Sequence, residues 1–595
     1  MNQGLYNAEI SQRGQDIFKS LVERGTGSLW TAHAHLTLGR DLDDFVDVVK
    51  RDLASDTLGL PGAGGPFQVL PAMLLVCRWE DQLPEEIVTL VRDFFLKGVL
   101  DRGNTENHWM MFYAGSLLAA EWLAEEPVMW NGQSPVAIRD EATRWIMGTI
   151  ERTARLGHHE YDSTGYHVEH FAPLVGVYEH TQNLELKSQV EKVLSLLVAD
   201  MALEYFYGAW AGGHSREGYR ENTGMRIGPV RGLHYLYFGG EFDPLQDVQG
   251  FAIPVAVAGY RPPALFAEIA LDRSQPHVVK KTKAPRNIYR HTDRDPKPVR
   301  KYTFMSRSFA LGSTQVGLPG PPAGPIDLVS WDLSWDGPKH EAKIVCNHPY
   351  RDPGRFSAFL GSLPLSARRD VGDPKPYLQR PDRLFGASPF EQMMQHEGTI
   401  IVLYRIPEDD EAPFVNLYLP KSIHWVAQDG WLFGDVGDFY VSLRPLAAYN
   451  WERICESRND ATMVSDGDLI DGWLLRMEDV NAGLVLEAVE ADDVDDFASY
   501  CNNRANKDVD LANWLENAQV VVETFDGKTL DMTYDGAHCV DGEVIDYDAW
   551  PLYASPSAEA NVNTGKMRFF YGDQVLNLDF DVDVQAPMVP MRVIG

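Results

Sequence analysis

The sequence predicts a helical N-terminal half followed by an antiparallel β half. Apolar residues recur with a helical period of about 3.6 up to roughly residue 270, and with a period of two after roughly residue 300. Because the helices all precede the strands, separate α and β domains are expected rather than an alternating α/β fold. A chain of 595 residues is also too long for one core, so two or three domains are expected.

Residues 1–270 contain roughly ten helical segments joined by short turns. In residues 83–100, Ile87, Val91 and Phe94 fall on one helix face, and Pro84 stands near the first turn. The sequence has no repeat of fixed length, which disfavours a regular solenoid. Helical hairpins in succession can stack into a bundle or close into a toroid, and the periodicity fits both.

Residues 271–301 interrupt the acidic composition of the chain. They hold ten Lys or Arg against three Asp, together with several prolines. The stretch is interpreted as a surface linker or, alternatively, as a basic lip that helps to hold an anionic ligand. It separates the helical domain at 1–270 from the β region that follows.

Residues 302–510 are expected to form an antiparallel β-sandwich domain, and residues 511–595 a small C-terminal β domain. Runs of β-branched and aromatic residues are divided by turn residues in this region. The pair Asp526 and Gly527 is a hairpin signal. The second boundary is expected where residues 500–515 interrupt the strands.

Composition and charge exclude several classes of function. A formal net charge of −33 argues against nucleic acid and against an anionic membrane surface as partners. No run of 18 apolar residues is present, so no transmembrane helix is expected. The first residues have no apolar signal core, so the chain is expected to be cytoplasmic, or exported and given without its leader. The sequence leaves a homo-oligomer open.

Cysteine and glycine motifs give no sign of a cofactor. The five cysteines are scattered without a CxxC pair, which favours reduced thiols over a single disulfide. The run "GLPGAGGPF" lacks the Lys-Ser/Thr of a phosphate-binding loop, and no GxGxxG follows a predicted strand. No GxSxG elbow is present either. No cofactor is therefore expected.

Polar residues of the helical half concentrate at three junctions between loops and helices. They are Asn104, Glu106, Asn107 and His108 in residues 104–108; His158, His159, Glu160, Tyr161, Asp162, Tyr166, His167, Glu169 and His170 in residues 157–174; and His214, Arg216, Glu217, Tyr219 and Arg220 in residues 208–224. In a helical toroid such junctions line one rim, so the three segments are expected to share one cleft.

Asn, His, Tyr and Arg together suit the β-elimination of a uronic acid. An amide and a cation beside the sugar carboxylate stabilise the charge that develops when the neighbouring C–H proton is removed. Tyr or His can remove that proton, and Tyr can return one to the leaving oxygen. Because free Tyr has a pKa of about 10, a tyrosine base needs a neighbouring cation. Arg216 near Tyr219, or His167 next to Tyr166, could supply it.

These segments resemble those of the α-toroid polysaccharide lyases, which include heparinase II/III-like, alginate and chondroitin lyases. "NTENHW" is similar to their Asn-containing loop-to-helix segment, "EYDSTGYHVEH" to their acid-Ser-x-x-Tyr helix start, and "GGHSREGY" to their His/Arg/Tyr segment. The resemblance implies an N-terminal (α/α) toroid or incomplete barrel followed by an antiparallel β-sandwich. It also implies lyase activity on an acidic polysaccharide or oligosaccharide.

The same resemblance implies roles for individual residues. Asn107 would neutralise the carboxylate with help from Arg216, and Tyr166 would be base and acid, alone or with His108 or His214. Candidate substrate-binding residues are Glu106, Tyr161, His167, Tyr219, Arg220 and His348, the last from "IVCNHPYRDPGRFSAFL" in the β region.

Structural roles for some of these residues stay open. Asn104 and Asn107 suit N-caps of the helix that follows them, and so do Asp162 and Ser163 for the next. The β region lacks the His-Gly-His run of heparinase II, which argues against a metal bound there and against heparin as the substrate. The histidines of residues 158–170 lack the HExxH spacing, which favours structural histidines over metal ligands.

Two other functions fit the sequence. An (α/α)-barrel glycoside hydrolase would need two carboxyl groups around the scissile bond. Candidates for that pair are Glu106, Glu160, Asp162 and Glu217. A non-catalytic glycan-binding or scaffold protein is the third possibility, and it predicts binding without turnover.

Overall fold

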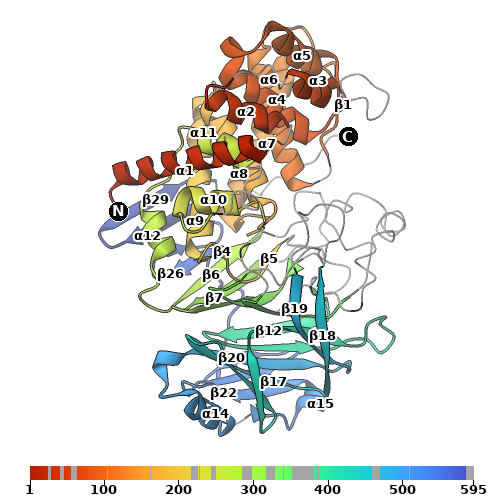
Figure 1. The fold of residues 1–595 in the computed structure, drawn as a ribbon, viewed down its shortest axis with the longest axis vertical. Helices are drawn as coiled ribbons and strands as arrows, with labels where there is room; N and C mark the ends of the chain where they lie inside the picture. Colours follow the sequence, from red (N-terminus) through yellow and green to blue (C-terminus); the bar gives the residue numbers. More distant parts are fainter. Residues whose placement is uncertain are drawn as a thin grey trace.

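The computed structural model describes residues 1–24, 28–40, 46–54, 63–103, 105–160, 162–215, 226, 228–242, 250–284, 298–315, 328–338, 341–350, 381, 384, 387–457, 469–507 and 509–583. Helices form its N-terminal half and antiparallel sheets the rest, one above the other in Figure 1. The prediction of a helical half followed by an antiparallel β half is confirmed.

The helical half consists mainly of helices packed in pairs. They are α1 (Gln3–Arg24), α2 (Leu29–Thr37), α3 (Val46–Ala54), α4 (Pro66–Trp79), α5 (Glu85–Lys97), α6 (Glu106–Trp122), α7 (Pro135–Leu156), α8 (His167–His180), α9 (Leu184–Leu203), α10 (Arg231–Phe238), α11 (Ala252–Val257) and α12 (Leu265–Leu271). The predicted apolar face of α5 is buried through Ile87, Val91, Phe94 and Phe95.

Five of these helices form a closed inner ring. Helix α2 contacts α4, α4 contacts α6, α6 contacts α8, α8 contacts α11, and α11 contacts α2 again. Other helices lie outside this ring, as α7 and α9 do against α6 and α8. Helix α6 is apolar on almost every side because it is packed all round. The closed ring is an (α/α) toroid, which the periodicity alone did not distinguish from a bundle.

A twelve-stranded sheet lies beneath the toroid, and its strand order is β18-β19-β14-β11-β10-β8-β7-β6-β26-β27-β28-β29. Its strands are β6 (His277–Lys283), β7 (Val299–Met305), β8 (Phe309–Gln315), β10 (Trp331–Trp335), β11 (Lys343–Asn347), β14 (Val415–Pro420), β18 (Tyr449–Ser457), β19 (Leu469–Met477), β26 (Tyr553–Ser555), β27 (Ala558–Ala560), β28 (Lys566–Tyr571) and β29 (Gln574–Asp579).

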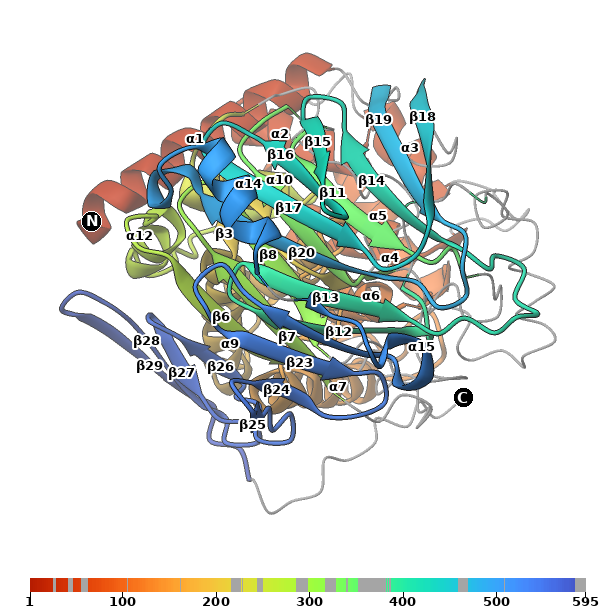
Figure 2. The ribbon, with the colours of Figure 1, turned by 90° about the horizontal axis from the view of Figure 1, so that it is seen from below.

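A six-stranded sheet packs against the far face of the large sheet, as Figure 2 shows from below. Its strands are β12 (Glu391–His396), β13 (Thr399–Tyr404), β15 (His424–Gln428), β16 (Trp431–Asp435), β17 (Phe439–Pro445) and β20 (Gly483–Glu490). Phe309 of β8 meets Phe439 of β17 with ring centroids 5.1 Å apart, so the two sheets share a core. This is the predicted β-sandwich.

A small outer sheet covers the six-stranded sheet together with two short helices. The strands are β21 (Val509–Asp510), β22 (Gln519–Glu523), β23 (Thr529–Thr533), β24 (His538–Val540) and β25 (Glu543–Val544), and the helices are α14 (Phe497–Ala505) and α15 (Trp514–Asn517). Gly527 lies between the paired strands β22 and β23 with φ of +86°, as the hairpin signal predicted.

Two expected boundaries differ from the structure. The stretch 271–301 was expected as a linker, but β6 and the start of β7 lie within it and are central strands of the large sheet. The stretch 511–595 was expected as one small domain, but it divides between the outer sheet and strands β26–β29 of the large sheet. Both differences arise because β26 pairs with β6, a contact between residues about half a chain apart that local patterns do not reveal.

Two other expectations concern the cysteines and the presence of membrane-spanning helices. All five cysteines lie within the described ranges and are free thiols, as predicted. Across the described ranges, no helix is both long and apolar enough to cross a membrane.

Candidate functional site

The first polar segment stands at the N-terminus of α6, on the inner ring. Thr105 is the N-cap, and its Oγ1 accepts a hydrogen bond from the backbone N–H of His108 at 3.4 Å. Asn107 therefore does not have the N-cap role that was left open for it as an alternative, and Asn104 lies outside the described residues. The Asn107 side chain is fully buried, and its Oδ1 accepts a hydrogen bond from Thr105 Oγ1 at 3.1 Å. The cap residue thus orients the amide.

His108 is the more accessible neighbour of Asn107. Its side chain is half-buried, and its ring packs edge-on against Phe67 with centroids 5.2 Å apart. On the other side the ring lies against Gly103, where an added Cβ would come within 2.5 Å of His108 Nδ1. Gly103 has φ of +74°, so both the backbone and the contact with the ring require glycine.

Glu160 joins the first polar segment to the second. Its Oε2 accepts a hydrogen bond from Asn107 Nδ2 at 2.9 Å and is 2.8 Å from His170 Nε2 on α8. All three side chains are buried. The amide of α6, the carboxylate of the loop and the imidazole of α8 therefore form one hydrogen-bonded chain across two inner helices.

The loop before α8 carries the predicted tyrosine. Tyr166 is the N-cap of α8, so neither Asp162 nor Ser163 takes that position. Ser163 Oγ instead accepts a hydrogen bond from the backbone N–H of Tyr166 at 3.0 Å. Tyr166 is half-buried at the N-terminal end of α8. Asp162 has φ of 51°, in the left-handed region that L-residues seldom adopt. Contacts of its carboxylate with the sheet hold it in that conformation.

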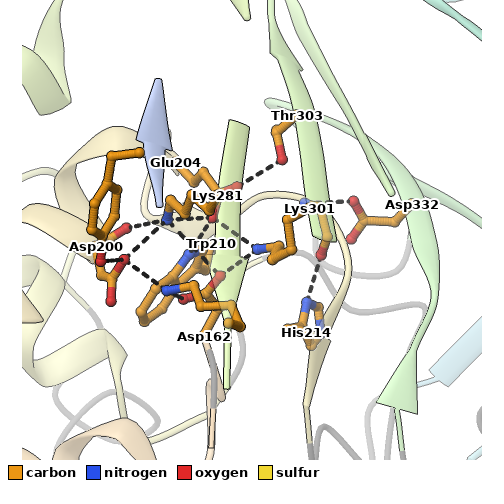
Figure 3. A network of polar contacts seen from close by, with 12 residues as sticks. Asp162, Asp200, Glu204, Trp210, His214, Lys281, Lys301, Thr303 and Asp332 are labelled. Carbon is orange, nitrogen blue, oxygen red and sulfur yellow. Dashed lines mark hydrogen bonds and ion pairs between the residues drawn. The ribbon is translucent and has the colours of Figure 1, made fainter. Parts of the chain in front are cut away.

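Three lysines of the large sheet meet three carboxylates of the helical half in a buried network (Figure 3). This lysine–carboxylate network consists of Lys281, Lys283, Lys301, Asp162, Asp200 and Glu204. Alternate residues of a strand face the same side, so these odd-numbered lysines of β6 and β7 all point toward the toroid. The basic stretch that was interpreted as a linker or lip instead supplies an internal counter-charge.

The contacts of the network are short and numerous. Lys283 Nζ is 3.0 Å from Asp162 Oδ1 and 2.7 Å from Asp200 Oδ1. Lys301 donates to Asp162 and, at 2.9 Å, to Glu204 Oε2. Burial alone would raise the pKa of Asp162, but the three lysines hold that pKa well below its usual range. Asp162 is therefore ionised and fixes its loop to the sheet.

The third polar segment is anchored on the same network. Trp210 Nε1 donates to Glu204 Oε2 at 3.1 Å, and the backbone N–H of Gly212 donates to Asp332 at 2.9 Å. His214 belongs to β5 (His214–Ser215), which pairs with β9 (Leu328–Val329) from the β half. His214 is buried, and its Nδ1 is 2.6 Å from the carbonyl oxygen of Gly212. Because a carbonyl only accepts, Nδ1 carries the hydrogen and Nε2 has the lone pair.

The structure therefore connects the described parts of the three polar segments. Segments one and two meet at Glu160, and segments two and three meet at the lysine–carboxylate network. Four predicted residues, together with Asn104 and Glu217, lie outside the described residues. The four are Tyr161, Arg216, Tyr219 and Arg220.

Two predicted substrate-binding histidines lie in the interior. His167 is fully buried against Trp210, with ring centroids 4.9 Å apart, and burial lowers its pKa to about 3. It is therefore uncharged at neutral pH and does not supply the cation expected beside Tyr166. His348 is buried within the β half, where its Nδ1 is 2.8 Å from Ser388 Oγ and its Nε2 is 3.3 Å from Asp410.

Sequence reasoning missed the residues that hold the site together. Asp200 and Glu204 lie at the end of α9, within an apolar pattern that indicated only core packing. Two acids inside such a pattern are themselves a signal, because buried carboxylates need partners. Their partners are the lysines of β6, which lie in a stretch whose basic composition suggested a surface segment.

A separate surface pocket lies at the other end of α6. It has a volume of about 540 Å³ and is lined by Glu121, Arg139, Asp140, Thr143, Arg144, Gln182 and Asn183. Glu121 is 14 positions after Asn107, or about 20 Å along the helix axis. None of the predicted site residues lines this pocket.

Comparison with known proteins identifies likenesses among solved structures only. No family model matches the chain, and no curated protein matches it in sequence. Heparinase III aligns over 88% of this chain and 81% of its own, with a TM-score of 0.42 and 10% identity. Heparan sulfate lyase from Pedobacter heparinus aligns over 91% of this chain and 83% of its own, with a TM-score of 0.37 and 10% identity. Chondroitin AC lyase from Streptomyces coelicolor aligns over 94% of this chain and 88% of its own, with a TM-score of 0.40 and 10% identity.

Proposed function

We propose that this chain is a lyase that cleaves a uronic-acid-containing polysaccharide or oligosaccharide by β-elimination. The observation that carries the proposal is the fixed amide of Asn107. Its oxygen accepts from Thr105 and one N–H donates to Glu160, and we assign the second N–H of the amide to the substrate carboxylate. A preorganised neutral donor of this kind stabilises the charge that develops on the carboxylate.

The helix ends around Asn107 favour an anion. Helices α6 and α8 both begin in this region, and each N-terminus carries a partial positive charge. The Asp162 carboxylate does not cancel this effect, because it is neutralised by lysines. Arg216, outside the described residues, is proposed as the cation at the substrate carboxylate.

Tyr166 is proposed as the group that removes and returns the proton. The base takes the proton from C5 of the uronate, a double bond forms between C4 and C5, and the C4–O bond breaks. The leaving oxygen then takes up a proton, so no water is consumed. His214, whose Nε2 has the lone pair, and His108 are the alternative bases. Glu106, Tyr161, Tyr219, Arg220 and His348 stay predictions as substrate-binding residues.

The carboxylate-pair hydrolase has less support from the described residues. A hydrolase needs one carboxylic acid that is protonated at working pH. The lysines hold the pKa of Asp162 well below its usual range, so Asp162 does not provide that acid.

The test is incubation of the full chain with a panel of uronic-acid polysaccharides and oligosaccharides. The expected result is a rise in ultraviolet absorbance from a conjugated unsaturated uronate, without water uptake. Tyr166→Phe and Asn107→Ala should each lower the rate at least about 10²-fold. Tyr178→Phe is the matched control, because Tyr178 is a half-buried tyrosine on the same helix α8.

Two outcomes would contradict the proposal. New reducing ends without the ultraviolet signal would show hydrolysis instead. Equal losses in Tyr166→Phe and Tyr178→Phe, with the melting temperatures of both unchanged, would remove Tyr166 from the catalytic role.

A further inference from the structure

Three histidines lie against one another beneath the candidate site. His158 and His159 follow the end of α7, and His170 comes from α8. One ring nitrogen from each lies within 4.8 Å of the others, and all three side chains are buried. The ring centroids are 4.6 Å apart for His158 and His170, 4.8 Å for His158 and His159, and 5.0 Å for His159 and His170.

One ring nitrogen of this cluster lacks the hydrogen bond that a buried imidazole usually makes. Among the described residues, His158 Nδ1 has no hydrogen-bond partner. A buried polar atom without a partner is costly, and each such atom in a native protein calls for an explanation. An ion that accepts the lone pair of this nitrogen would remove the cost.

A small cavity lies beside the rings. It has a volume of about 10 Å³ and is lined by His158, His170, Thr149 and Thr153 together with apolar side chains. A cavity of this size holds about one water molecule or one ion. The space therefore fits a single bound atom rather than an organic ligand.

Glu160 orients one of the three rings from behind. It holds Nε2 of His170 at 2.8 Å, which leaves Nδ1 as the nitrogen of this ring that can bind an ion. A carboxylate behind a histidine is the usual outer partner of a metal-bound imidazole, because it fixes the ring and raises its basicity. Here that carboxylate also binds Asn107, so the cluster is coupled to the candidate site.

We propose that His158, His159 and His170 bind one divalent first-row transition metal ion, with Zn²⁺ preferred. Three neutral imidazoles suit Zn²⁺ better than Mg²⁺ or Ca²⁺, which take oxygen ligands. The ion joins the end of α7 to the start of α8 and so stiffens the loop that carries Tyr166. The sequence favoured structural histidines because the HExxH spacing is absent, but two adjacent histidines on a loop need no helical spacing. This inference is independent of the proposed lyase activity.

The experiment uses the full chain, purified without a polyhistidine tag, stripped with a chelator and then dialysed against Zn²⁺ or Co²⁺. We expect close to one metal ion per chain by elemental analysis and a higher melting temperature than for the stripped protein. The Co²⁺ form should show visible absorption bands of an ion bound by nitrogen ligands. Less than about a tenth of an ion per chain in the parent protein, with no Co²⁺ bands, would overturn the proposal.

Variants locate the ion. His158→Ala and the milder His170→Gln should each lose most of the bound metal, whereas His180→Ala, a histidine on α8 outside the cluster, should keep it. Equal metal loss in His180→Ala would also overturn the proposal. Tyr166→Phe should keep full metal content while losing the proposed lyase activity, so the two proposals fail separately. If His158→Ala does not fold, the Co²⁺ spectrum of the parent protein still decides the question.

Discussion

Asn107 and Glu160 are 53 positions apart in the chain and are joined by a hydrogen bond of 2.9 Å between Nδ2 and Oε2. Thr105 donates to the oxygen of the same amide, so both ends of the Asn107 side chain are assigned by their partners. A flipped amide would place its oxygen against the Glu160 carboxylate, which only accepts when ionised. Glu160 therefore sets the direction in which Asn107 can donate.

Removal of the Glu160 carboxylate should lower activity through Asn107. Under the proposed function, Glu160→Ala should lower kcat by about 10²-fold, because the amide is no longer held in its productive rotamer. Glu160→Gln keeps one acceptor oxygen and should retain more activity than Glu160→Ala. The measurement is kcat and KM determined separately for the parent and both variants.

Glu121 provides the control for that prediction. It is a carboxylate at the other end of α6, and it accepts hydrogen bonds from Thr181 Oγ1 at 2.9 Å and from the backbone N–H of Gln182 at 3.0 Å. Glu121→Ala should lower the melting temperature but leave kcat unchanged. If both alanine variants lose kcat equally, the effect is general destabilisation rather than loss of orientation at Asn107.

Loss of one lysine from the buried network should destabilise the whole chain. Lys301→Met leaves the Asp162 and Glu204 carboxylates short of a counter-charge in the interior. The expected cost is about 3–5 kcal/mol of unfolding free energy, as for a buried pair that has lost one partner. Denaturant midpoints of the parent and variant measure it.

An exposed pair is the matched comparison for Lys301. Lys566 and Asp579 are 3.2 Å apart, and their side chains are 70% and 56% exposed. Lys566→Met should change the midpoint little, because water and salt screen such a pair. A Lys301→Met protein as stable as the Lys566→Met protein would contradict a structural role for the network.

The order of helices before strands could be predicted from local periodicity, but the burial of the network lysines could not. The helix of residues 85–97 and the hairpin at Gly527 depend on neighbours in sequence, and both are present as expected. The burial of Lys281 and Lys283 depends on Asp200 of α9 and on Glu204 directly after that helix, roughly 80 positions earlier. Composition reports how basic a segment is, but not which carboxylates meet it.

The sequence singled out candidate site residues, but it could not show which contacts hold them in place. Asn107 and Tyr166 stood out because polar residues at the mouths of apolar helices are unusual. His214 was expected at such a junction too, but it lies on the short strand β5. That Asn107 meets Glu160, and that Asp162 is a lysine partner rather than a cap, follow from tertiary contacts alone. His167 was expected beside a cleft but is fully buried, because adjacent residues at a helix start point in different directions.

Gly157 should be irreplaceable where α7 ends against the sheet. It has φ of 84° and ψ of 168°, a region open essentially to glycine alone. An added Cβ would lie 2.2 Å from the carbonyl oxygen of Thr282 on β6. Gly157→Ala should therefore cost more than about 3 kcal/mol, from backbone strain together with the clash.

Gly132 is the comparison position for backbone strain without a clash. Its φ is +77°, but no atom lies within 4 Å of an added Cβ. Gly132→Ala should cost only about 1 kcal/mol, from the left-handed backbone alone. Denaturant midpoints again give both values, and equal costs at the two positions would contradict both the clash with β6 and the stricter backbone requirement at Gly157.

Glu391 should make stability fall as pH rises toward neutrality. Its carboxyl group is buried in the β-sandwich, where it accepts hydrogen bonds from Ser330 Oγ at 2.8 Å and Tyr404 Oη at 3.0 Å. Burial raises its pKa from 4.5 to about 7, although these two hydroxyls act in the opposite direction. The folded protein therefore binds a proton at Glu391 that the unfolded chain has already lost.

The sign of the effect follows from this raised pKa. The contribution of Glu391 to stability is fully present below about pH 4.5, is lost as pH rises to about 7, and then stays constant. The total loss is about 3 kcal/mol. Glu391→Gln has no proton to lose at this position, and the two hydroxyls can donate or accept as its amide requires. The difference in unfolding free energy between parent and variant, measured from pH 4 to pH 8, should therefore shift by about 3 kcal/mol in favour of the variant. Parallel curves would mean that Glu391 ionises in the folded protein at its ordinary pKa.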